Sequence, residues 1–208
     1  MAVYRMADLG KLADRIIGKS EIVSRAAADT INKTATFSIK ASIDAIIKEV
    51  NLHPSYIKSH IKTTARAKYD NLVAIVSANE RGTLLTRYPH AKTTTGYRVS
   101  VNRTGGFREI KNARLMTLRG SGSKAIGLRN KDAVEYFQKA LGKGKRTSKK
   151  SRKLQRIIAK ARRKPYGMTA LHSRSINQLF TSVRTDIQPE LTAFMFKTFH
   201  EDFTRLDK

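Results

Sequence analysis

Apolar side chains recur every three or four positions over residues 20–50, which predicts one long amphipathic helix. Three consecutive alanines at 26–28 are small enough to let another backbone approach this helix closely. The stripe consists of Val23, Ala26, Ala27, Ile31, Ala35, Ile39, Ile43, Ile46, Ile47 and Val50. A shorter helix is predicted before it, with Leu9, Leu12, Ala13, Ile16 and Ile17 on one face and Gly18 at its end.

A further helix is predicted after His53. Pro54 suits the first helical turn, where a missing amide hydrogen costs nothing, and Tyr56, Ile57 and Ile61 supply an apolar face. Residues 1–62 are therefore expected to form the N-terminal helical part of the fold.

Residues 63–130 change to a pattern typical of strands. Tyr97, Val99 and Val101 alternate with polar residues. Two glycine-containing turns are predicted, at Gly105-Gly106 and at residues 120–123. The other apolar runs are Leu72, Val73, Ile75 and Val76, then Leu115, Met116 and Leu118, then Ala125–Arg129. Together they indicate a small antiparallel sheet, followed by a short helix over Asp132–Leu141.

Residues 174–206 show apolar stripes of helical spacing, which we interpret as two paired helices, the second opening at Pro189. The helix of residues 20–50 is their natural partner. The sequence alone leaves open whether this packing occurs within one chain or between protomers. The residues expected to carry it are Ile31, Ile39, Ile43, Phe194, Phe199 and Phe203.

The expected fold class is therefore α+β, in one domain spanning residues 1–208. A long N-terminal helix and paired C-terminal helices would pack on a small central antiparallel sheet. Residues 142–164 would form a basic extension, part loop and part amphipathic helix, since Leu154, Ile157, Ile158 and Ala161 keep helical spacing.

Charge divides the chain more sharply than hydropathy does. The net charge is +26, from 42 Lys and Arg against 16 Asp and Glu. Residues 1–50 carry +2 and residues 165–208 carry 0, whereas residues 51–142 and 143–164 carry +12 each. We therefore expect the nearly neutral ends to form a scaffold and the middle to face an acidic partner.

The basic segment contains no acidic residue between positions 143 and 164, and its long side chains suit contact with phosphates rather than base reading. An acidic protein surface would attract the same charges, and a solvated loop is the third reading. The candidate contact residues are Lys145, Arg146, Lys149, Lys150, Arg152, Lys153, Arg156, Lys160, Arg162, Arg163 and Lys164. No aromatic lies inside the segment, and the flanking Tyr136, Phe137 and Tyr166 are expected to anchor its ends.

Composition argues against export, membrane insertion and catalysis. The first 19 residues mix charged and apolar positions, no run approaches the roughly 18 apolar residues of a membrane span, and cysteine is absent. These features suit a soluble protein made in a reducing cytoplasm.

No enzymatic or metal motif is recognised. Residues 120–125 have the glycine spacing of a dinucleotide-binding turn, but a strand rather than a helix is expected after them, so we interpret them as a hairpin turn. The five histidines lie far apart, and the carboxylates of residues 51–142 are too scattered for a metal-dependent nuclease. We expect no catalytic residue, no cofactor and no metal.

The order of these segments resembles the minor tail protein Z family of long-tailed bacteriophages, the tail completion proteins. The resemblance rests on the Ala-rich helix at 26–35, a helical element after Leu52, a strand-rich basic centre, and the segment Tyr166–Ser175 before the C-terminal helices. Tyr166-Gly167 stands where the family often has a Gly-Pro-Ser-like step, and the basic segment is long.

The resemblance implies a structural virion protein at the head-proximal end of the tail, synthesised in the host cytoplasm. Its implied protein partners are other tail and neck proteins, namely the tail terminator and the head–tail connector. The resemblance also implies that copies of the chain form a six-fold ring and that the ring contacts phage DNA. The alternative from the residues themselves is a free, sequence-nonspecific nucleic-acid-binding protein.

Overall fold

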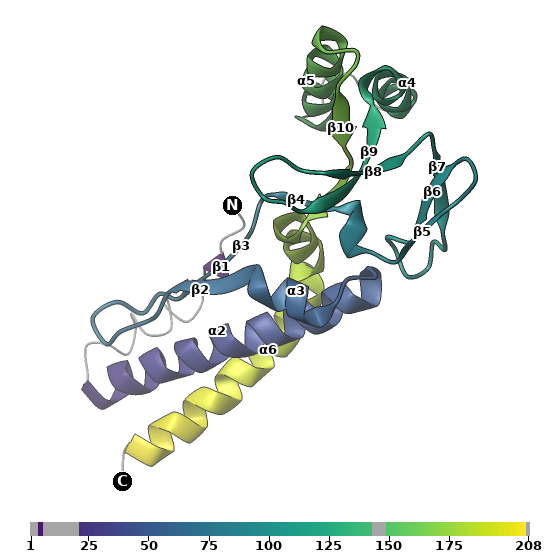
Figure 1. The fold of residues 1–208 in the computed structure, drawn as a ribbon. Coiled ribbons are helices and arrows are strands. Elements are labelled where there is room, and N and C mark those ends of the chain that lie inside the picture. Colours follow the sequence, from purple (N-terminus) through teal and green to yellow (C-terminus); the bar gives the residue numbers. More distant parts are fainter. Residues whose placement is uncertain (1–3, 6–20, 143–148, 207–208) are drawn as a thin grey trace. The chain divides into compact units, whose positions relative to one another are not determined.

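The structure is a computed structural model that describes residues 4–5, 21–142 and 149–206 (Figure 1). The α+β class is confirmed, with a long N-terminal helix, small antiparallel sheets and a long C-terminal helix. The chain, expected to be one domain, divides into two compact units. The terminal unit comprises Met1–Gly82 and Arg174–Lys208, and the central unit comprises Thr83–Ser173.

The terminal unit is built on two long helices, α2 (Glu21–Glu49) and α6 (Ile176–Leu206), which pack side by side (Figure 1). They run antiparallel, because Asp29 near the start of α2 contacts Arg205 while Glu49 at its end contacts Ser182. Ile31 and Ile46 of α2 and Phe180 of α6 are fully buried. The helix predicted over residues 20–50 is thereby confirmed.

The buried face of α2 also carries hydroxyl groups. Thr34, Ser38 and Ser42 are at most 1% exposed. Each hydroxyl donates to a carbonyl oxygen of its own helix, at 2.6–2.8 Å. These polar atoms can therefore be buried without a partner from another element.

The expectation of paired C-terminal helices is wrong, because α6 continues through Pro189. A proline inside a helix removes one hydrogen bond and costs about 3 kcal/mol. Ile187 and Leu191, on either side of it, are buried. The packing of this continuous apolar face outweighs the local penalty that predicted a break.

The terminal unit also contains the short helix α3 (Pro54–Ser59), which starts as predicted. The His53 ring caps it by accepting a hydrogen bond from the Ser55 amide at 3.3 Å. Ile61, expected on this helix, instead begins strand β2 (Ile61–Ala65), since α3 has already ended at Ser59.

Strand β2 belongs to a three-stranded antiparallel sheet with β3 (Ile75–Ala78) and β1 (Tyr4–Arg5), in the order β1-β3-β2. Asn32 of α2 ties the chain beyond this sheet to the helix, because its amide donates to the Ala67 carbonyl and accepts from the Ala67 amide, both at 2.9 Å. The helix expected over residues 9–17 lies outside the described residues.

The chain enters the central unit within β4 (Gly82–Leu84), continues through the 3-10 turn η1 (Leu85–Arg87), and leaves the unit within β11 (His172–Ser175). Between them lie two three-stranded antiparallel sheets, so the single sheet expected from the sequence is divided. The first has the order β5-β6-β7 and the second β10-β9-β8. Their strands are β5 (His90–Lys92), β6 (Gly96–Val99), β7 (Arg108–Lys111), β8 (Arg114–Thr117), β9 (Lys124–Arg129) and β10 (Met168–Ala170).

The division between these sheets falls at Asn112, whose φ of 60° turns the chain between β7 and β8. Strand β8 therefore pairs with β9 instead of extending the first sheet. The β8–β9 connection is the predicted hairpin: Gly120 and Gly122 have positive φ, and the Leu118 amide donates to the Ser123 carbonyl at 2.9 Å. The dinucleotide-turn reading is thereby excluded.

Helices α4 (Asn130–Leu141) and α5 (Lys149–Arg163) form an antiparallel pair beside the second sheet (Figure 1). Both were predicted. In α5, Ile158 and Ala161 are buried and Leu154 and Ile157 are half-buried, so the apolar stripe faces inward. The basic extension was predicted to be part loop and part helix, and its residues 143–148 lie outside the described residues.

Candidate nucleic-acid interface

Positive charge is concentrated in the central unit. Thr83–Ser173 contains 24 Lys and Arg against three Asp and Glu, whereas the terminal unit contains 18 against 13. The central unit thus carries +21 of the total of +26. A surface of this charge density attracts polyanions over distances of about 8 Å in physiological salt.

Helix α5 displays most of the predicted contact residues on its outward side. The exposed cations are Arg152, Lys153, Arg156, Lys160, Arg162 and Arg163, with Lys164 directly after the helix. Lys149 and Lys150 belong to its first turn. Lys145 and Arg146 lie outside the described residues. The burial of the apolar stripe fixes this orientation, because turning the cations inward would expose Ile158.

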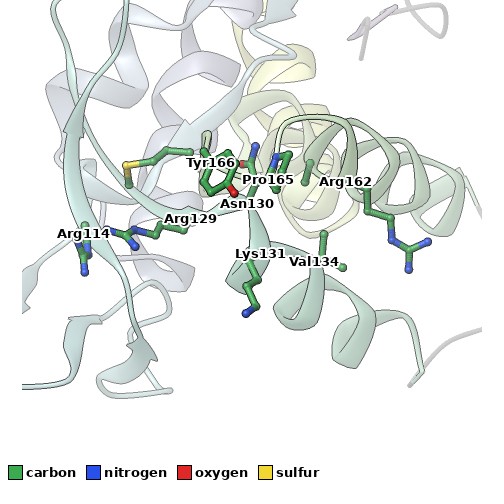
Figure 2. Close-up of a pocket in the computed structure, with 10 residues that line it drawn as sticks. Arg114, Arg129, Asn130, Lys131, Val134, Arg162, Pro165 and Tyr166 are labelled. Carbon is green, nitrogen blue, oxygen red and sulfur yellow. The ribbon is translucent and has the colours of Figure 1, made fainter.

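A cleft of about 870 Å³ lies where the start of α4 and the end of α5 meet the second sheet (Figure 2). Four cations from four different elements line it: Arg114 of β8, Arg129 of β9, Lys131 of α4 and Arg162 of α5. Figure 2 shows Arg114 and Arg129 together on one side of the cleft and Arg162 on the other. No carboxylate is among its lining residues. We call this site the basic cleft.

The remaining wall of the basic cleft is less polar, with Val134, Ala161, Pro165 and Met168. Tyr166 completes it, and 98% of this residue is exposed. The expectation that Tyr166 anchors the end of the basic segment is therefore wrong. In the turn that follows α5, hydrogen bonds to backbone atoms hold the chain in place. The Tyr166 ring takes no part in these bonds and stays in solvent.

Asn130 makes those contacts. Its amide nitrogen donates to the Lys164 carbonyl at 2.5 Å, its side-chain oxygen accepts from the Thr169 hydroxyl at 2.7 Å, and its backbone amide donates to the Gly167 carbonyl at 2.9 Å. Gly167 must be small here, because a Cβ would lie 2.7 Å from the Asn130 amide nitrogen. These bonds hold the start of α4 against the turn that bears Tyr166.

Acidic side chains lie outside the lining of the basic cleft. The nearest acids in sequence, Asp132 and Glu135 on α4, do not line it. Glu135 pairs with Lys139 at 2.8 Å, and this contact lowers the pKa of the carboxyl, so the group stays ionised. Among the described residues, no group of three or more His, Asp or Glu side chains is placed to hold a metal ion.

A second cationic area lies on the β5-β6-β7 sheet. The Arg98 guanidinium sits 5.1 Å from the centre of the Phe107 ring, and Phe107 is 54% exposed. Glu109 on β7 accepts hydrogen bonds from Thr93 and Thr95, which lower the pKa of its carboxyl. Unlike the basic cleft, this area has an ionised carboxylate paired across the strands with its arginine, Arg98.

The residues predicted for assembly or packing all lie in the terminal unit. Ile31 is fully buried, and Ile39, Ile43, Phe194, Phe199 and Phe203 are half-buried. Phe194 stacks on Phe37 of α2, with ring centres 4.2 Å apart. Phe199 and Phe203 stack on each other with ring centres 6.2 Å apart. The α2–α6 contact is therefore made within the chain.

Sequence reasoning missed most of the basic cleft. Of its cations only Arg162 was a candidate, because Arg114, Arg129 and Lys131 stand apart in the sequence and belong to no basic run. No local signal marks them, since only the folding of β8, β9, α4 and α5 brings them together.

In the scan of protein-family models and the searches of curated proteins and solved structures, no match to this chain was found.

Proposed function

We propose that this chain is a non-enzymatic structural protein of a bacteriophage tail. It would act at the head-proximal end, in a ring that helps to join the tail to the head. The terminal unit would serve as scaffold and the central unit as the surface that meets an acidic partner. The proposal includes synthesis in the host cytoplasm, incorporation into the virion, and a six-fold ring contacting the tail terminator and the head–tail connector.

The observation that carries this proposal is the unequal distribution of positive charge between the two units. The terminal unit, with its helix pair, carries a net charge of only +5, whereas the central unit carries +21. This division suits a component of a larger assembly in which one unit is structural and the other meets DNA or a neighbouring acidic protein. The order of segments that resembles tail completion proteins is its second support. Within the described part of the chain, no helix is long and apolar enough to cross a membrane.

The second candidate function is a free nucleic-acid-binding protein without sequence preference. The basic cleft favours it, because four cations and an exposed tyrosine form a binding surface by themselves. Both candidates involve contact with polyanions, and they differ in whether the protein is needed to build particles.

Disruption of this gene in a phage that carries it separates the two. We expect filled heads beside separate or abnormally finished tails under the electron microscope, with normal morphology restored when the gene is supplied in trans. Normal infectious particles from the disrupted phage would exclude the tail role and leave the free nucleic-acid binder.

A further inference from the structure

We propose that the basic cleft binds single-stranded nucleic acid, with its four cations on successive phosphates and Tyr166 stacked on an unpaired base. The inference deepens the proposed function by naming the partner of the central unit. It names nucleic acid as the ligand, with an acidic protein as the alternative that the test can return, and it places the contact at the base of the α4–α5 pair rather than only along α5.

The first argument is electrostatic. Arg114, Arg129, Lys131 and Arg162 share one cleft without a carboxylate among its lining residues. A small domain tolerates this self-repulsion more easily when a ligand neutralises it. Three of the four are arginines, whose planar guanidinium binds phosphate oxygens through two hydrogen bonds at once.

The second argument is size. A volume of about 870 Å³ lies in the upper part of the range for small-molecule sites, so the cleft has room for more than one phosphate. The cations come from both sides of the cleft (Figure 2). A chain of phosphates that runs through it would meet Arg114 and Arg129 on one side and Arg162 on the other.

The third argument is the exposed ring. Tyr166 is 98% exposed, although aromatic rings usually bury most of their surface. It is presented on a rigid turn, because Pro165 precedes it, Gly167 donates to the Lys164 carbonyl at 3.0 Å, and Asn130 binds both Lys164 and Gly167. Because the backbone of this turn is held, stacking of a base has to order only the side-chain torsions of Tyr166.

The exposed ring also distinguishes single-stranded from duplex nucleic acid. An acidic protein could bind the same four cations and pack against the tyrosine, so it is the competing ligand in the test below. In a duplex the bases are already stacked and paired, so the ring would have no free face to meet. An unpaired base has one, and stacking of this kind tolerates any sequence.

The test is fluorescence anisotropy with the full-length protein and a labelled oligothymidine of about 16 nucleotides, within the range of known single-strand site sizes. A duplex of the same length is the comparison. The variants are R114Q/R129Q and, should that pair fail to fold, K131Q/R162Q. The matched control is R103Q/R108Q, which removes the same charge from exposed positions of the central unit outside the cleft.

We expect either cleft pair to lower single-strand affinity about tenfold or more, and to flatten the logarithmic salt slope by about 1.4 for the two lost phosphate contacts. The control pair should lose less than about threefold, because its charges act only at long range. Tyr166→Ala should lower single-strand affinity about tenfold and leave duplex affinity unchanged, while Tyr166→Phe keeps the stacking face and binds normally.

Equal losses in the cleft and control pairs would overturn the proposal, since they would indicate adsorption by overall charge. Unchanged binding by Tyr166→Ala would remove the stacking role. Displacement of the oligonucleotide by polyglutamate at equal charge concentration would assign the cleft to an acidic protein instead. Binding is measured on the purified protein and the tail role on particles, so either proposal can fail without the other.

Discussion

Asp202 of α6 and Lys33 of α2 form an ion pair of 2.5 Å, although 169 residues separate them in the sequence. The Asp202 side chain is only 3% exposed. It also lies 3.2 Å from Arg205 and accepts a hydrogen bond from the Thr30 hydroxyl at 3.4 Å. One buried carboxylate therefore joins the N-terminal half of α2 to the end of α6.

Asp202→Ala should destabilise the terminal unit by about 2 kcal/mol, because charge-assisted hydrogen bonds of a buried carboxylate are lost. Lys33 is half exposed, so it can turn to water and limits the loss. The matched control is Glu201→Ala, which removes an exposed carboxylate 4.0 Å from Lys197 and should change stability by less than about 0.5 kcal/mol. Urea unfolding followed by circular dichroism measures both, and equal midpoints would contradict this role of Asp202.

Phe194→Ala should weaken the α2–α6 contact by about 2 kcal/mol. Its ring lies parallel to that of Phe37 within 6°, with centres 4.2 Å apart, so the substitution loses both the stacking and the buried apolar area. Phe196→Ala, on the same helix but 55% exposed, is the control and should cost about 0.5 kcal/mol or less. Thermal unfolding of the two variants gives the comparison. Similar losses would mean that the stacked pair adds nothing to stability.

Asn130→Ala should loosen the basic cleft, because the Lys164 carbonyl and the Thr169 hydroxyl both lose their partner. We expect a loss of about 2 kcal/mol, concentrated in the central unit. Hydrogen–deuterium exchange should show faster exchange at the start of α4 and in β10, with α2 and α6 unaffected. Gln138→Ala, at an exposed position of α4, should leave the exchange pattern unchanged. Unaltered exchange in Asn130→Ala would show that the turn is held by other contacts.

The hydrogen bonds from Thr95 and Thr93 lower the pKa of Glu109, and Lys111 adds a smaller effect in the same direction. Because the folded pKa lies below the unfolded one, the stabilisation from these bonds is present above the ordinary pKa of a glutamate and is lost as the pH falls through the lowered value. NMR titration of the Glu109 carboxyl should show its pKa rising toward the ordinary value in Thr95→Val. An unchanged titration midpoint in this variant would rule out the hydrogen bond as the cause.

Features set by neighbours in the sequence could be predicted. The apolar stripe of α2, the proline and histidine at the start of α3, and the glycines of the β8–β9 hairpin each act over a few residues. The amphipathic helix α5 was predicted for the same reason, because its stripe of four apolar residues persists among the lysines and arginines.

Features set by distant contacts could not be predicted. Pro189 locally favours a helix break, and only burial of α6 against α2 overrides it. Strand β10 has no alternating pattern of its own, and it forms because β9 offers an edge to which Met168, Thr169 and Ala170 can pair. The basic cleft depends on both β9 and α4, so its cations could not be grouped before the fold was known.

The insertion of the central unit within the terminal unit has a consequence for synthesis on the ribosome. Helix α2 emerges early, but α6, its packing partner, is complete only when residue 206 has been made. At roughly 5–20 residues per second the wait is on the order of ten seconds, during which the contiguous central unit can already fold. During this interval the apolar stripe of α2 is exposed and can bind apolar surfaces other than α6. Thr34, Ser38 and Ser42, whose hydroxyls are satisfied by their own helix once it has formed, make that nascent surface less adhesive than an all-aliphatic stripe.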